Sequence, residues 1–408
     1  MSVTVIDEAT GDILVAGKRV FPIGLSDPPP LAGTAPTSGL PAWAEIAGAG
    51  VNFFRNYTVW TAAAVEEQLL AVRLELDAAQ AEGLQVWPAL AGIDKDLSQR
   101  HLLDQVVNAL KGHDGLSVWK GVDEPALGRV PAPGCVAVYR HLRALDPEHP
   151  VAIIEAPRAP APIPGQTVPL TEAAIRRYAS ACDIHGVDIY PVSIPPGLHA
   201  GGPPVNTDIS VVGDMTRILA RATARRAIWT TLQIAWSGVL PPHPLIFPTL
   251  QQARFMAYDA VIAGARGLFF YGGQVKQSMT PADRQRGWNW TYWEHVQRPL
   301  LVELSDSAHL SALLAPPASQ PVKSSAPDVA TSARHTNGVF HLIAARRGPT
   351  GSETIRFTGL PANAIHGTVL EHPSNPARTV TAAQGSFTDP IPFGPHHARV
   401  YRFPTPAT

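Results

Sequence analysis

The stretch LSVWKGVDEP, residues 116–125, is a short run of strand-forming residues that leads to two adjacent carboxylates, Asp123 and Glu124, and stops at Pro125. Two like charges held side by side cost free energy unless the site uses them. The stretch therefore predicts a buried strand whose end carries acids with a function, and the identity of the fold depends on what surrounds it.

Seven further β-rich runs recur along the chain, with starts separated by roughly 30 to 45 residues, the size of one strand–helix unit. They are VFPIGLS (20–26), VNFFRNY (51–57), LQVWPAL (84–90), VAIIEA (151–156), CDIHGVDIY (182–190), AIWTTLQIAW (227–236) and GLFFYG (267–272). Helical spacing of apolar residues fills gaps between them, as in residues 64–82, 103–110 and 248–264. Eight such units predict an α/β fold of the (β/α)8 TIM barrel type.

A doubly wound open sheet is the alternative to a barrel, but it would not need eight even units. It would also show a glycine-rich phosphate turn after its first strand. The turn here reads GLSDP, residues 24–28, which lacks that pattern. The apolar runs show no clean alternation, as expected for strands that are buried on both faces.

The character of the sequence changes after residue 312. A Pro/Ser-rich linker precedes short alternating runs with turn residues, namely 338–345, 353–359, 367–372, 377–382 and 397–403. We therefore expect an N-terminal β-hairpin extension (1–19) over the bottom or side of the barrel, the barrel itself (20–312), a linker (313–324) and an antiparallel β-sandwich (325–408).

The composition argues against several classes of binding partner. The net charge is −1, from 32 Lys and Arg against 33 Asp and Glu, which argues against nucleic acid or an anionic membrane. The two cysteines, Cys135 and Cys182, are too few for a thiolate metal cluster and read as ordinary buried thiols. No metal or cofactor is expected. No signal peptide is visible, so the expected location is cytoplasmic, or secreted or periplasmic if a leader was trimmed.

In a (β/α)8 barrel the working residues lie at the C-terminal ends of the strands. This rule selects Asp27, Arg55, Asn56, Asp123, Glu124, Glu155, Asp188, Tyr190, Gln233, Trp236 and Tyr271. Carboxylates dominate this set. His185 stands alone on the sixth strand, and no pair of histidines at these ends has ligand spacing, so we interpret His185 as a hydrogen-bonded core residue.

Aromatic residues give a second signal. Trp288 and Trp290 crowd the segment after the eighth strand, and Trp119 lies on a strand that ends at the same face as Trp236. Flat rings with one polar tip suit the faces of sugars. The alternative is that the tryptophans after residue 287 form the inner stripe of the last helix.

The chain resembles the (β/α)8 glycoside hydrolases that carry a β-rich C-terminal domain. The matching pieces are GKRVFPIGL, GVNFFRNY, VDEP, VDIYPV, TTLQIAW, RFMAYDAVIAGARGLFFYGG and the ending GSFTDPIPFGPHHARVYRF. The resemblance covers nearly the whole chain but assigns no numbered family. It implies a carbohydrate substrate and makes Glu124 the general acid/base. The alternative role for Glu124, capping the next helix, suits glutamate poorly.

One departure from the resemblance leaves the mechanism open. Retaining members of the large clan carry a nucleophilic glutamate on the seventh strand, where this chain has Gln233. In the first interpretation the second carboxylate is Asp188, which we expect to face the same cavity as Glu124. Asp27 and Glu155 are less favoured candidates for this role. A second interpretation is a substrate-assisted N-acetylhexosaminidase, in which Asp123 orients a 2-acetamido group and Glu124 is the acid. A third is a barrel that only binds sugar.

An interpretation from another class is a phosphosugar enzyme, because many (β/α)8 barrels bind phosphate after strands seven and eight. Gly272, Gly273 and Lys276 would form that site. The aromatics and the appended sandwich weigh against it. The sugar, the linkage, retention or inversion, and the oligomeric state are not readable from the sequence.

Overall fold

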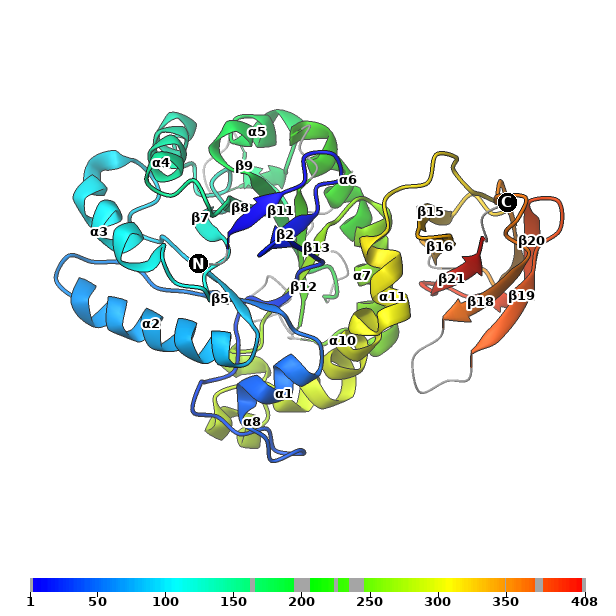
Figure 1. Cartoon of the computed structure of the whole chain (residues 1–408), viewed down its shortest axis with the longest axis horizontal. Coiled ribbons are helices and arrows are strands. Elements are labelled where there is room, and N and C mark those ends of the chain that lie inside the picture. Colours follow the sequence, from blue (N-terminus) through cyan, green and yellow to red (C-terminus); the bar gives the residue numbers. More distant parts are fainter. Residues whose placement is uncertain are drawn as a thin grey trace.

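The computed structural model describes residues 3–161, 166–193, 206–223, 227–234, 246–348, 350–370 and 377–405. Its centre is an eight-stranded parallel sheet with the order β6-β5-β4-β13-β12-β11-β8-β7 (Figure 1). Single parallel bridges, Val86 to Leu116 and Ala89 to Lys120, join the two outer strands and nearly close the barrel. The strands are β4 (Ile23–Leu25), β5 (Phe53–Asn56), β6 (Gln85–Pro88), β7 (Trp119–Asp123), β8 (Val151–Glu155), β11 (Ile184–Ile189), β12 (Ile228–Gln233) and β13 (Gly267–Tyr271).

All eight predicted strands are present, and β11 and β12 are parallel neighbours as expected. The helices around them include α2 (Val65–Ala81), α3 (Arg100–Leu110), α4 (Ala132–Leu145), α6 (Val211–Thr223), α7 (Leu250–Ile262) and α10 (Arg298–Ser305). Shorter helices are α1 (Ala42–Gly48), α5 (Glu172–Arg176), α8 (Pro281–Arg286), α9 (Trp290–Tyr292) and α11 (Ser307–Leu314). Among the described residues, no helix combines the length and apolar character needed to cross a bilayer.

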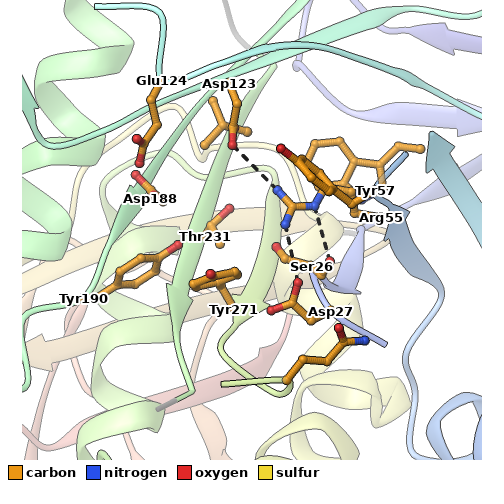
Figure 2. Close-up of a pocket in the computed structure, with 13 residues that line it drawn as sticks. Ser26, Asp27, Arg55, Tyr57, Asp123, Glu124, Asp188, Tyr190, Thr231 and Tyr271 are labelled. Atoms are coloured by element: carbon orange, nitrogen blue, oxygen red, sulfur yellow. Dashed lines mark hydrogen bonds and ion pairs between the residues drawn. The ribbon is translucent and has the colours of Figure 1, made fainter. Parts of the chain in front are cut away.

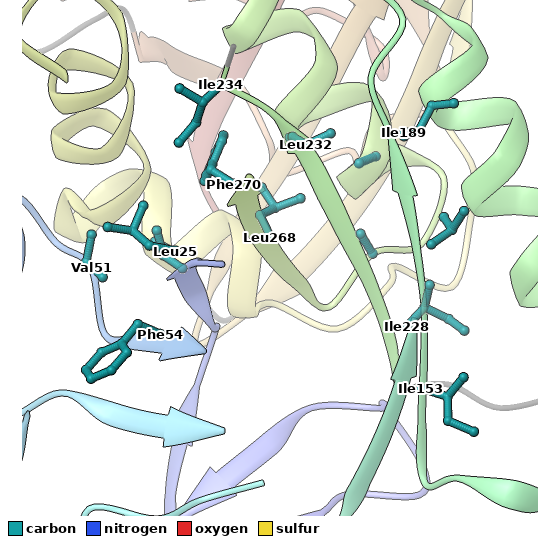
Figure 3. Packing of buried hydrophobic residues seen from close by; sticks show 14 of the residues in the cluster. Leu25, Val51, Phe54, Ile153, Ile189, Ile228, Leu232, Ile234, Leu268 and Phe270 are labelled. Carbon is teal, nitrogen blue, oxygen red and sulfur yellow. The ribbon is translucent and has the colours of Figure 1, made fainter. Parts of the chain in front are cut away.

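Alternation along each strand separates two cores. Residues of one parity fill the barrel interior, where Trp87, Trp229 and Phe269 pack at centroid distances of 4.6–5.3 Å. Residues of the other parity face the helices, and Figure 3 shows part of that outer layer. The interior is so full that Gly24 and Gly186 have no room for a side chain, because a Cβ atom there would lie 2.3 Å from Phe269 or Ile154.

The N-terminal segment closes the bottom of the barrel. It forms the antiparallel sheet β1 (Thr4–Ile6), β2 (Ile13–Val15) and β3 (Lys18–Val20), one strand more than the expected hairpin. Ile13 and Val15 join the apolar cluster of the barrel interior. The site must therefore lie at the opposite, C-terminal end of the strands.

The C-terminal region is a pair of antiparallel sheets, with strand orders β14-β17-β20 and β15-β16-β21-β18-β19. The strands are β14 (Lys323–Ser324), β15 (Val329–Thr336), β16 (Val339–Arg346), β17 (Glu353–Thr358), β18 (His366–Leu370), β19 (Arg378–Thr381), β20 (Ser386–Phe393) and β21 (Ala398–Pro404). The sandwich lies beside the barrel against α7 and α11 (Figure 1). Arg334 of β15, 2% exposed, donates to the carbonyls of Leu313 and Val261 near the C-terminal ends of these two helices.

Candidate active site

A cavity of about 560 Å³ opens at the C-terminal end of the barrel. Each of the eight strands, or the residue directly after it, supplies one lining residue: Ser26, Arg55, Trp87, Asp123, Ile154, Asp188, Thr231 and Tyr271. Asp27, Tyr57, Glu124, Tyr190 and Gln274 complete the lining from the following segments. The cavity therefore has an apolar floor, formed by Trp87 and Ile154, under a ring of polar and acidic groups.

The acidic pair of residues 123 and 124 occupies an irregular strand end. The register between β7 and β8 shifts between Lys120 and Asp123. Glu124 follows with φ 45°, in the left-handed region that non-glycine residues avoid. Its amide donates to the carbonyl of Ile154 at 2.7 Å, and its carbonyl accepts from the amide of Gly128 at 2.9 Å. Such a conformation costs of order 1–3 kcal/mol, so the contacts around the loop must impose it.

The carboxyl groups of Glu124 and Asp188 are close enough for a hydrogen bond to contribute to the pKa of each. Figure 2 shows the two groups facing each other from β7 and β11. A direct bond between carboxyls requires a proton, because two carboxylates have only acceptors. Burial, and then the charge of Asp123, raise the pKa of Glu124. Burial and Glu124 raise the pKa of Asp188 well above its usual range, so the pair should keep a proton to higher pH than ordinary carboxyls do.

Asp123 has the opposite electrostatic environment. Burial alone would raise its pKa, but Lys120, 2.9 Å from Oδ1, and Arg55, 3.9 Å from Oδ2, lower it below the ordinary value. Asp123 therefore loses its proton more easily than an ordinary aspartate, whereas the neighbouring Glu124 keeps its proton to higher pH. Two neighbouring acids with pKa values pushed apart in this way are typical of acid–base sites.

Arg55 links two acids across the cavity. Its guanidinium also lies 3.5 Å from Asp27, and its carbon lies 5.2 Å from the centre of the Tyr57 ring. Figure 2 shows the guanidinium between the two aspartates. Burial raises the pKa of Asp27, although Arg55 and the amide of Gly272 oppose that effect. Opposite them, the rings of Tyr190 and Tyr271 stack with centroids 5.5 Å apart.

Four of the residues selected from the sequence point away from the cavity. Asn56 donates to Glu75 of α2 at 2.7 Å, and the indole of Trp119 donates to Asp146 at 2.7 Å. Glu155 is fully buried and bonds the amide of Ala126 and the ring of His185. Gln233 is also fully buried, and its amide both donates to and accepts from the backbone of Val192 instead of reaching a carboxylate.

The tryptophans after β13 form a packed cluster. Trp288 and Trp290 are at most 1% exposed and pack against each other and Trp293, as in the alternative that places them in the inner stripe of a helix. The indole of Trp288 donates to the carbonyl of Asp27, so it supports the first loop of the site without lining the cavity. Trp236 lies outside the described residues.

Sequence reasoning missed six lining residues: Ser26, Tyr57, Trp87, Ile154, Thr231 and Gln274. The usable signal was the two-residue period of each strand. If Asp188 faces the barrel interior, then Gly186 and Ile184, two and four residues earlier on β11, face it too. Applied to β8 and β5, the same parity separates Ile154 from Glu155 and Arg55 from Asn56.

The segment considered for phosphate binding is engaged by the protein itself. The amide of Gly272 donates to Asp27 at 3.3 Å, and a Cβ atom on Gly273 would lie 2.2 Å from the Trp288 indole nitrogen. Lys276 is exposed and does not line the cavity. Within the described part of the chain, no three His, Cys, Asp or Glu side chains gather as a metal site would require.

Comparisons with known proteins give matches in structure alone. No family model matches the sequence, and a search of curated proteins finds no match. A solved structure titled simply glycoside hydrolase is similar over 100% of this chain and 97% of its own, with TM-score 0.65 and 11% identity.

Two further solved structures resemble the whole chain. A glycoside hydrolase family 5 protein from Bacteroides vulgatus matches 99% of this chain and 94% of its own, with TM-score 0.64 and 11% identity. An α-L-arabinofuranosidase from Thermotoga maritima matches 99% and 100%, with TM-score 0.52 and 10% identity. At these identities the likeness concerns the fold: a (β/α)8 barrel with a C-terminal β-sandwich, an architecture that these glycoside hydrolases share.

Proposed function

We propose that the protein is a glycoside hydrolase in which Glu124 protonates the leaving oxygen of a glycosidic bond. The observation that carries this proposal is the facing pair of Glu124 and Asp188, whose pKa values are raised, next to Asp123, whose pKa is lowered, in a cavity at the C-terminal end of the barrel strands. A raised pKa lets a carboxylic acid keep its proton near neutral pH until the leaving group takes it.

The contact between Glu124 and Asp188 bears on the second catalytic role. Two opposed catalytic carboxyls stand about 5 Å apart in retaining enzymes and roughly 6.5–9.5 Å apart in inverting ones, so that the sugar fits between them. Carboxyls that share a hydrogen bond are closer than either separation. In the proposed mechanism Asp188 therefore helps to keep Glu124 protonated and does not act as the nucleophile that attacks the sugar.

This leaves the substrate-assisted mechanism as the favoured form of the proposal. The ionised Asp123 accepts a hydrogen bond from the N–H of a 2-acetamido group, whose carbonyl oxygen then attacks the anomeric carbon as Glu124 protonates the departing oxygen. Water opens the resulting ring intermediate with Glu124 acting as base. A second candidate, favoured by the position of Asp27 across the cavity, is an ordinary glycosidase with Asp27 or Asp123 as the second carboxylate.

The charges of the cavity support an uncharged sugar. Arg55 is the one Lys or Arg among its described lining residues, and it lies between Asp27 and Asp123. A uronate or sulfated sugar would find no unshared cation there and would face four acids. We propose that anionic glycans are rejected.

The test is a screen of aryl glycosides and glycans that pairs each 2-acetamido sugar with its 2-hydroxy analogue, with product anomers followed by NMR. Wild type is compared with Asp123→Asn, Glu124→Gln and Asp188→Asn. Cleavage restricted to 2-acetamido sugars and abolished by Asp123→Asn supports substrate assistance. Cleavage of the 2-hydroxy analogues at equal rates contradicts that form of the mechanism, and an unchanged rate in Glu124→Gln on a natural glycan removes Glu124 from its role.

A further inference from the structure

A buried ion pair lies directly behind the loop that carries Glu124. Glu155 of β8 and His185 of β11 are both 0% exposed, and the His185 Nε2 atom lies 3.3 Å from Glu155 Oε1. The other carboxylate oxygen, Oε2, accepts from the amide of Ala126 at 3.3 Å. Neither side chain lines the cavity, so the pair faces the layer between barrel and helices.

The pair contacts the loop two residues after a strained backbone position. Glu124 has φ 45°, and Pro125 fixes the backbone that follows it. The Tyr178 hydroxyl donates to the carbonyls of Pro125 at 3.2 Å and Val130 at 2.7 Å, which gives the loop a further anchor. A strained conformation persists only where the surroundings over-determine it. The hydrogen bond from the Ala126 amide to Glu155 is one contact by which the barrel can hold this conformation.

We propose that Glu155 and His185 are positioning residues, which hold the loop 124–130 so that the Glu124 carboxyl meets Asp188 inside the cavity. The inference rests on the proposed function of Glu124 and adds two residues that never touch the substrate. The arrangement follows from strand parity: Ile154 faces the cavity, while Glu155, its neighbour on β8, faces outward under the loop.

The charge state of the pair is consistent with this role. Burial alone would lower the pKa of His185, but Cys182 and Glu155 beside it raise that pKa to about 9. His185 therefore holds its proton more strongly than an ordinary histidine, and its Nε2 atom faces Glu155. A charged acceptor also binds the Ala126 amide more strongly than a neutral one would.

The experiment compares Glu155→Leu and Glu155→Gln with wild type, and it has a readout that requires no substrate. Hydrogen exchange of the loop 124–130 is measured by NMR or mass spectrometry. Glu155→Leu removes the acceptor, and exchange at Ala126 should rise about tenfold or more, the size expected for loss of a hydrogen bond to a charged group. Glu155→Gln keeps an acceptor oxygen and should raise exchange there by only about two- to fivefold.

A matched control is Glu75 of α2, which accepts from Asn56 in the same layer. Among the described residues, Glu75 makes no hydrogen bond to the loop 124–130. Glu75→Leu and Glu75→Gln should leave exchange of that loop at the wild-type level. If Glu155→Leu does not fold, Glu155→Gln decides the matter, because unchanged exchange at Ala126 in that variant overturns the proposal.

The second readout is kinetic. In Glu155→Leu, kcat on a substrate with a poor leaving group should fall about tenfold or more with little change in KM, because the proton donor is misaligned while binding is intact. The loss should shrink on a substrate with a good leaving group, which needs no protonation. A uniform loss on both, or a change in KM alone, contradicts a positioning role. If wild type hydrolyses no glycoside, the proposed function fails, and the exchange data still decide the role of Glu155 in the loop.

Discussion

The barrel holds a pair of facing carboxyl groups and the sandwich buries a single one, and the negative charges of the two sites are compensated in different ways. In the sandwich, Asp389 is 0% exposed and accepts two hydrogen bonds of 2.7 Å from the guanidinium of Arg378, with a third of 2.9 Å from Arg399. In the barrel, Glu124 and Asp188 face each other with raised pKa values, and Asp188 Oδ1 is buried without a hydrogen-bond partner among the described residues.

The pKa values follow this difference. Burial alone would raise the pKa of Asp389, but the Arg378 and Tyr401 hydrogen bonds lower it below the ordinary value. Burial and mutual repulsion raise the pKa values of Glu124 and Asp188. Asp389 thus stabilises the sandwich, whereas Glu124 and Asp188 lower the stability of the barrel. Like charges buried side by side are expected where they serve a function.

The largest effect we expect is on folding, from Asp389→Asn. The substitution leaves two guanidinium groups without their counter-charge inside the sandwich, and removing one partner of a buried pair costs about 3–5 kcal/mol. Urea unfolding measures the change. The control is Glu353→Gln, which weakens the pair between Arg346 and the 58%-exposed Glu353 side chain; an exposed pair is worth at most about 1 kcal/mol. Equal losses in the two variants would mean that Asp389 is not the stabilising centre described here.

The next effect is on catalysis, from Glu124→Gln. The rate on a natural glycan should fall at least about a hundredfold, the low end for a lost general acid. The free energy of unfolding should not fall, because the substitution removes a carboxyl whose burial is unfavourable. Steady-state kinetics and urea unfolding of the same preparation check both parts. A variant that loses stability in proportion to activity would place Glu124 in the structural class of Asp389.

A smaller effect distinguishes the clusters by pH. Asp188→Asn should raise the free energy of unfolding at pH 7 by about 0.5–2 kcal/mol, the range for relieving a strained active site. Because the pKa of Asp188 is raised in the folded state, its ionisation opposes folding at neutral pH, and the gain should vanish as pH falls below the unfolded value near 3.9.

Asp389 should show the opposite dependence. Its folded pKa is lowered, so its contribution is present above the unfolded value of about 3.9 and is lost as pH falls through the folded pKa. Urea unfolding curves of wild type and both variants between about pH 3 and 7, a range that includes the unfolded carboxyl pKa values, give the slope of the free energy of unfolding against pH at each site. Slopes of the same sign would contradict the comparison.

The smallest expected effect is that of inorganic phosphate. The amide of Gly272 already donates to Asp27, so this amide is not free to bind an anion at the end of β13. Phosphate and chloride at equal ionic strength should give the same melting temperature and the same rates. A phosphate-specific stabilisation that is lost in Lys276→Ala would revive the phosphosugar interpretation.

Much of the fold could be predicted because the sequence repeats one unit. Eight apolar runs and the helices between them predicted the barrel, and the change of pattern after residue 312 predicted the sandwich. Strands β14, β15 and β20 are not among the predicted alternating runs, although β20 lies within the ending that resembles the last strands of such sandwiches. β15 and β20 mix polar residues with a weak alternation, as in VATSARHT and SFTDPIPF.

The candidate site was harder to predict because position along a strand does not give direction. Asp123, Glu124 and Asp188 were selected and do line one cavity, whereas Glu155 and Asn56, selected by the same rule, face the helices. The strained turn at Glu124 and the contact of Gln233 with Val192 depend on loops from other strands. Such contacts arise in tertiary structure and leave no local pattern.

The most direct test of the account is the titration of the cavity carboxyls by carbon-13 NMR, with Glu and Asp labelled and signals assigned from Glu124→Gln, Asp188→Asn and Asp389→Asn. We expect the pair of Glu124 and Asp188 to lose its shared proton well above the ordinary carboxyl range, while Asp389 stays ionised below it. If Glu124 and Asp188 both titrate near the ordinary values of about 4.3 and 3.9, the cavity holds no stored proton and the central claim is wrong.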